Sequence, residues 1–116
     1  MKPFVFAISL GILVLSAAGA WAEDCQLLAS EPAIPDGKVA DKAAMLKGSQ
    51  AVKAYMAETE VFLNCLDEAE KALGEEITAE QKAMFVARHN TAVEAMEGVA
   101  EQFNQQIRLY KARRKK

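Results

Sequence analysis

The chain has 116 residues, of which 52% are hydrophobic and 26% are charged, and its formal net charge at pH 7 is −2. This length allows one small domain at most and excludes a multidomain protein. The charge is unevenly distributed, because residues 108–116 contain six basic residues and no acidic one. The sequence therefore describes an acidic domain with a basic C-terminal tail.

The first 22 residues have the composition of a secretory signal peptide. Lys2 precedes the apolar run Phe4–Leu15, which has the usual length of a signal-peptide hydrophobic region. This run is shorter than the roughly 20 apolar residues that span a bilayer. Small residues in Ala20–Ala22 place the cleavage site before Glu23, and Ala18–Ala20 offers a second site. We therefore expect an exported protein, with an uncleaved membrane anchor as the alternative.

Two cysteines, Cys25 and Cys65, follow the predicted signal peptide. In an oxidising compartment such a pair usually forms a disulfide. The closed loop of roughly 40 residues would stabilise the domain by about 4 kcal/mol through chain entropy. Two free thiols, or pairing between two chains, are the alternatives. A redox or metal role is disfavoured, because there is no C-x-x-C motif and His89 is the only histidine.

Residues 23–40 have the composition of an extended arm. Pro32 and the Pro35–Gly37 run interrupt any helix and favour turn or extended backbone. A bridge to Cys65 would meet the following helix about 36 Å from its start. The arm can cover this distance only by running back antiparallel along that helix. The arm residues expected to cover apolar surface are Leu27, Leu28 and Ile34.

From Asp41 to Leu73, apolar or small residues recur at alternating spacings of four and three, the pattern of a long amphipathic helix. Asp41 suits the N-cap and Gly74 the position after the last turn. Gly48 costs about 1 kcal/mol relative to alanine. It either allows close approach of the arm or a partner, or is a tolerated interior glycine. The expected buried positions are Met45, Gly48, Val52, Tyr55, Thr59, Phe62, Leu66, Ala69 and Leu73.

Thr78–Gln81 has the pattern of a capping box and predicts a second helix from Ala79 to Lys111 or beyond. The short connection predicts that the two helices are antiparallel neighbours. Their apolar stripes are wider than a strict seam, so we expect further cover from the arm and from a second copy in a four-helix bundle. The expected seam of the second helix is Phe85, His89, Ala92, Met96, Val99, Phe103 and Tyr110, with Ile107 alongside.

Little in the sequence indicates catalysis. It contains no Ser-His-Asp set, zinc-ligand spacing or glycine-rich phosphate loop. We therefore predict that the protein is not an enzyme and has no cofactor, metal or small-molecule substrate. His89 is interpreted as a packed core residue rather than a ligand or base. The acidic residues between 67 and 80 form either a docking site for a cation or basic partner, or a solvated turn.

The basic tail has two interpretations. It either binds an anionic surface such as phospholipid, lipopolysaccharide or an acidic protein, or it is a frayed helix end whose cations favour the helix dipole. Each basic residue near an anionic membrane contributes about 1 kcal/mol. We expect no nucleic-acid partner, because an exported protein seldom meets one. The candidate contact residues are Arg108, Lys111, Arg113, Arg114, Lys115 and Lys116.

Several segments resemble a family of small exported proteobacterial proteins of uncharacterised function. The resemblance implies an exported helical protein with paired cysteines, and it implies no activity and no site residue. The segments are Ile34–Gly37, Ala51–Tyr55, Asn64–Leu66, His89–Val93 with Met96, and Val99–Asn104.

The expected architecture is an all-α, antiparallel two-helix hairpin of the coiled-coil type. Its parts are a signal peptide (1–22), an arm tied back by the disulfide (23–40) and a hairpin with a basic tail (41–116). The leading functional hypothesis is a non-enzymatic interaction or structural protein of the bacterial periplasm, acting as a homodimer or an adaptor for an unknown envelope protein. The second is a peripheral binder of anionic envelope surface through the tail. The third is a small enzyme or metal carrier.

Overall fold

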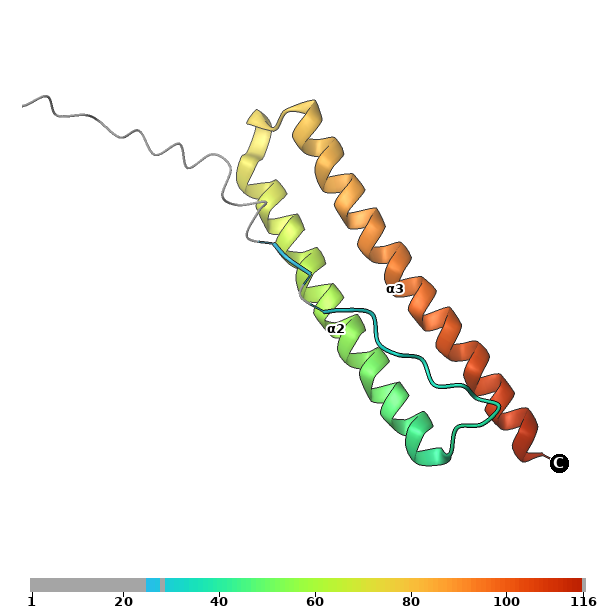
Figure 1. Ribbon diagram of the computed structural model, residues 1–116. Coiled ribbons are helices and arrows are strands. Elements are labelled where there is room, and N and C mark those ends of the chain that lie inside the picture. The colour runs from blue at the N-terminus through green and yellow to red at the C-terminus, as the bar shows by residue number, and fades with distance from the viewer. Residues whose placement is uncertain (1–24, 28, 116) are drawn as a thin grey trace, which may run out of the picture.

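The computed structural model describes residues 25–27 and 29–115. Two long helices, α2 (Lys42–Leu73) and α3 (Ala79–Arg114), pack side by side and antiparallel, joined by the 3₁₀ turn η2 (Gly74–Glu76) (Figure 1). No strand occurs in the described residues, and the expected all-α hairpin is confirmed. The predicted signal peptide, residues 1–22, lies outside the described residues.

Both helices begin where their N-cap residues predict, and α2 also ends at the predicted glycine. The Asp41 carboxylate accepts a hydrogen bond from the backbone N–H of Ala44 at 2.8 Å. The capping box of α3 is complete, because Thr78 and Gln81 each accept from the other's backbone N–H. Gly74 has a positive φ of 59°, which glycine adopts without steric cost, and so it ends α2. The helix α3 continues past Lys111 to Arg114.

The predicted seam of α2 is confirmed. Eight of its nine positions are buried, and only Leu73 at the end of the helix is half-buried. Thr59 is fully buried, and its hydroxyl donates to the backbone carbonyl of Tyr55 at 2.9 Å. The polar group therefore costs little, because its hydrogen bond is made within the helix.

The seam of α3 is only partly enclosed. Phe85, Ala92, Val99 and Phe103 are buried, as expected. The other four predicted positions are half-buried, because α2 and a thin arm cover only a strip of α3. These half-buried residues are His89, Met96, Ile107 and Tyr110.

The core divides into two clusters along the hairpin. The turn-end cluster lies toward η2 and the open-end cluster lies toward the start of α2 and the end of α3. The turn-end cluster contains Cys25, Phe62, Leu66, Ala69, Phe85 and Ala92. The open-end cluster contains Met45, Val52, Tyr55, Val99 and Phe103.

The arm joins the two clusters. It runs from Cys65, in the last third of α2, toward the open end, alongside both helices and antiparallel to α2, as expected (Figure 1). Leu27 packs against the turn-end cluster and Ile34 against the open-end cluster. The third residue expected to cover the helices, Leu28, lies outside the described residues.

Candidate functional site

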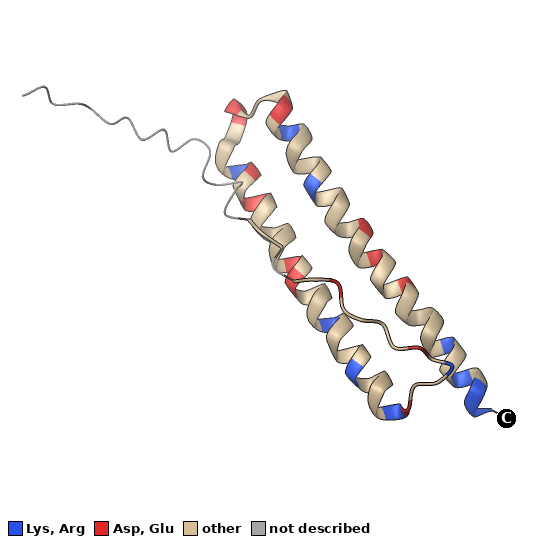
Figure 2. Ribbon diagram, in the orientation of Figure 1, with Lys and Arg blue, Asp and Glu red and all other residues tan. Residues whose placement is uncertain are grey.

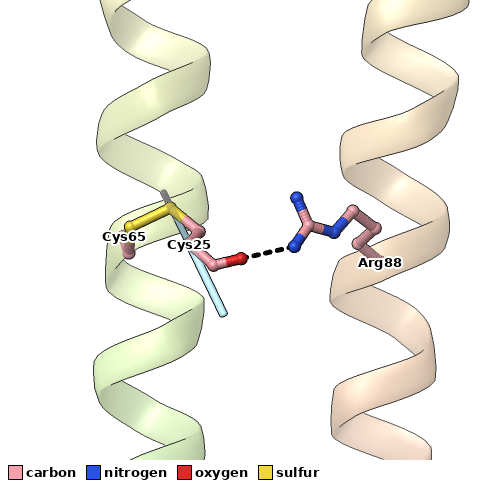
Figure 3. Close-up of a disulfide and its surroundings, with 3 residues drawn as sticks. All are labelled: Cys25, Cys65 and Arg88. Atoms are coloured by element: carbon pink, nitrogen blue, oxygen red, sulfur yellow. Dashed lines mark hydrogen bonds between the residues drawn. A yellow bond between two sulfur atoms is a disulfide. The ribbon is translucent and has the colours of Figure 1, made fainter. Parts of the chain in front are cut away.

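The disulfide fixes the start of the arm. Cys25 and Cys65 are bonded, with their Cα atoms 5.7 Å apart, and no described cysteine is free. The guanidinium of Arg88 donates to the carbonyl oxygen of Cys25 (Figure 3). It also lies 5.4 Å from the centre of the Phe62 ring. The arm is therefore bonded to α2 by sulfur and to α3 by Arg88.

Close backbone packing holds the other end of the arm. The backbone N–H of Gly37 donates to Oε1 of Gln106 at 2.8 Å. A Cβ atom at Gly37 would lie 2.0 Å from the carbonyl oxygen of Gln106, so only glycine fits this contact. At Gly48 a Cβ atom would lie 2.7 Å from Cγ of Pro35. Gly48 therefore permits the close approach of the arm, one of the two interpretations open from the sequence.

The C-terminal tail contributes to the same attachment. Arg113 donates to the carbonyl oxygens of Lys38, at 2.8 Å, and Ala40. Arg114 donates to the Tyr110 hydroxyl at 3.0 Å, and both guanidiniums lie about 5.5 Å from the centre of the Tyr110 ring. Arg113 therefore has a structural role that its position in a basic run did not reveal.

Basic residues from three segments gather at the open end, as Figure 2 shows. We call this group the basic cluster. Sequence reasoning found only its α3 members, although an antiparallel hairpin necessarily brings the start of α2 beside the end of α3. The members are Lys38 of the arm, Lys42 of α2, and Arg108, Lys111, Arg113, Arg114 and Lys115 of α3. The remaining predicted contact residue, Lys116, lies outside the described residues.

Two acidic residues, Asp36 and Asp41, lie among these cations. Each carboxylate accepts a local backbone hydrogen bond, from Lys38 and Ala44 respectively. Arg108 lies 3.5 Å from Glu101, but both side chains are largely exposed, so water screens the pair. The open end therefore keeps a strong excess of positive charge.

An apolar hollow of about 470 Å³ lies within the basic cluster, between the start of α2 and the end of α3. Four of its lining residues are apolar or aromatic, and we call them the floor: Met45, Leu46, Ile107 and Tyr110. Leu46 is 56% exposed, although it is a large apolar side chain. The other four lining residues of the hollow are cationic, and we call them the rim: Lys42, Lys111, Arg114 and Lys115. We call this feature the open-end hollow.

The opposite end of the hairpin is acidic. Its carboxylates are exposed apart from Glu70, which is half-exposed, and among the described residues no three of Asp, Glu, His and Cys are placed to hold a metal ion. His89 is half-buried and lines a pocket of about 200 Å³ with Asn90 and Glu70. The acidic residues are Asp67, Glu68, Glu70, Glu75, Glu76 and Glu80.

Within the described residues, no helix is long and apolar enough to cross a membrane. Comparisons of the chain with protein-family models, characterised proteins and solved structures found no match.

Proposed function

We propose that the protein is a non-enzymatic interaction protein of the bacterial cell envelope that binds anionic lipid surfaces through its open end. One observation carries this proposal. Cations from three separate segments gather at one end of the hairpin, and apolar side chains are exposed among them. Val39, in the arm turn, is 76% exposed, and Leu46 is 56% exposed.

This combination matches the physics of peripheral membrane binding. Each basic residue near an anionic membrane contributes about 1 kcal/mol. Charge alone gives reversible attraction, and insertion of apolar side chains adds the second contribution that stable binding needs. The opposite, acidic end is repelled by the same surface. We therefore expect the hairpin to meet the membrane with its open end.

The test is co-sedimentation of the oxidised protein with lipid vesicles. Binding is expected to vesicles containing phosphatidylglycerol and not to vesicles of phosphatidylcholine alone, and it should weaken as salt rises from about 0.1 to 0.5 M. Reversing two charges, Lys111→Glu with Lys115→Glu, should reduce binding at least tenfold.

The control is a single charge reversal, Lys53→Glu. This exposed residue lies on α2, outside the basic cluster, so its reversal should change binding little. Equal binding to both kinds of vesicle, or a loss of binding in Lys53→Glu as large as that in the double variant, would contradict the proposal.

A homodimer, or an adaptor for another envelope protein, is the second candidate. It is favoured by exposed apolar side chains away from the open end, because such residues are often contact sites. Val61 is 69% exposed on α2, and Met84 and Val86 are exposed on α3. Light scattering on the oxidised protein tests the dimer directly. A monomer mass at about 0.1 mM would exclude it under those conditions.

A further inference from the structure

We propose that the open-end hollow holds one acyl chain of an anionic phospholipid, with the lipid headgroup among the rim cations. This inference rests on the proposed function of the same end and adds to it a site for a single lipid molecule. The chain would lie on the floor of the hollow, and the phosphate would contact the ammonium and guanidinium groups around it.

The lining of the hollow supports an amphiphilic ligand. The volume of about 470 Å³ falls within the range of roughly 300 to 1,000 Å³ that is usual for small-molecule sites. A wholly polar ligand would leave the apolar floor in water, and a wholly apolar one would make no use of the cationic rim. An anionic lipid satisfies both, because it joins an acyl chain to a charged headgroup.

The rim cations are available to such a headgroup. Among the described residues, no ion pair or hydrogen bond engages the ammonium groups of Lys42, Lys111 or Lys115. Arg114 uses one nitrogen for the Tyr110 hydroxyl and keeps its other donors for a ligand. Arg113 differs, because it donates to two carbonyls of the arm and does not line the hollow, so we assign it no role in the site for the single lipid.

The same rim disfavours a second copy of this chain as the occupant. In a twofold dimer the same surface meets itself, so the four rim cations of one chain would face those of the other. Like charges brought together in this way repel each other. An acidic protein would match the rim but would not need the apolar floor.

The experiment uses a lipid that is monomeric in solution, lauroyl-lysophosphatidylglycerol below its critical micelle concentration. Calorimetry should show one lipid bound per oxidised protein chain. The zwitterionic lysophosphatidylcholine of the same chain length should bind at least tenfold more weakly. NMR chemical-shift changes should concentrate at the floor residues Met45, Leu46 and Ile107.

A matched pair of variants assigns the site. Leu46→Gln removes an exposed apolar part of the floor and should weaken binding of the monomeric lipid at least fivefold. Leu109→Gln makes the same change on α3, at the same end of the hairpin, but Leu109 lines a different hollow, beside Ile34 and Pro35. It should therefore leave lipid affinity unchanged. Circular dichroism would establish that both variants keep the native helix content.

The outcomes separate this inference from the proposed function. Vesicle binding without binding of the monomeric lipid would overturn the lipid site and leave the surface function standing. Absence of both vesicle binding and monomeric-lipid binding would overturn the lipid site and the proposed function together. Equal effects of the two leucine substitutions, or equal affinity for the two lipids, would also overturn the site. If the Leu46→Gln variant had a lower mass in solution than the unaltered protein, a second copy of the chain would be the occupant of the hollow. That result would also overturn the lipid site.

Discussion

The two ends of the hairpin are held together in different ways. At the turn end the helices are continuous through η2, and the disulfide and Arg88 fix the arm across them. At the open end, the described residues show no covalent link between the arm, α2 and α3 apart from the chain itself at Asp41. There the contacts are the Gly37–Gln106 hydrogen bond, the close packing at Gly48, and the hydrogen bonds from Arg113. The open end should therefore loosen before the turn end.

Removing the disulfide should have the largest effect on stability. The double variant Cys25→Ser with Cys65→Ser should lower the free energy of unfolding by about 4 kcal/mol, because the bridge closes a loop with a sequence separation of 40 residues. Urea denaturation followed by circular dichroism measures the loss. Reduction of the unaltered protein is the control and should give a similar loss. A change below about 1 kcal/mol would mean that packing alone holds the arm.

Gly37→Ala should detach the open end of the arm while leaving the turn end in place. The new methyl group would overlap the backbone of α3 at Gln106, and neither backbone can move away easily. We expect a loss of about 2 kcal/mol, within the range of overpacked sites. Amide hydrogen exchange should become faster over residues 36–40 and stay unchanged around Cys65. Equal acceleration at both ends would show that the ends are one cooperative unit.

Two helical glycines should respond to alanine with opposite signs. Gly98→Ala should stabilise the protein by about 1 kcal/mol, since nothing lies within 4 Å of its new methyl group and alanine favours helix. Gly48→Ala gains the same helix propensity but overlaps the Pro35 ring at 2.7 Å, so we expect a net loss of about 1 kcal/mol. The urea midpoints of the two variants give this comparison. A stabilising Gly48→Ala would show that the arm can move away from α2.

The sequence predicts the turn end better than the open end. The sequence patterns that predict the turn end are local or covalent. They are the spacing from Phe62 to Ala69, the capping box at Thr78, and the cysteine pair. The path of the arm followed from the disulfide and the length of the chain. The Gly48 contact could not be decided, because periodicity places a glycine on the seam without saying which segment approaches it.

The candidate site depended on long-range contacts. The basic run from residue 108 was visible in the sequence, but its joining with Lys38 and Lys42 required the hairpin to be folded in three dimensions. The open-end hollow was missed for the same reason. Leu46 lies next to the seam residue Met45, and a helical pattern alone gives no reason for it to line a cavity with Ile107.

The smallest expected effect concerns two neighbouring arginines that the sequence treats alike. Arg113→Gln removes hydrogen bonds to two carbonyls of the arm, whereas Arg114→Gln removes only the contact with Tyr110. Both side chains are exposed, so water competes for these bonds and the loss for Arg113→Gln should be about 1 kcal/mol or less. Arg114→Gln should change stability even less, but it should weaken vesicle binding more, because only Arg114 lies on the rim of the hollow. Urea denaturation and vesicle co-sedimentation of the pair measure both effects. If Arg114→Gln proved the more destabilising, the contacts that hold the open end would have to be reassigned from the arm to the Tyr110 hydroxyl.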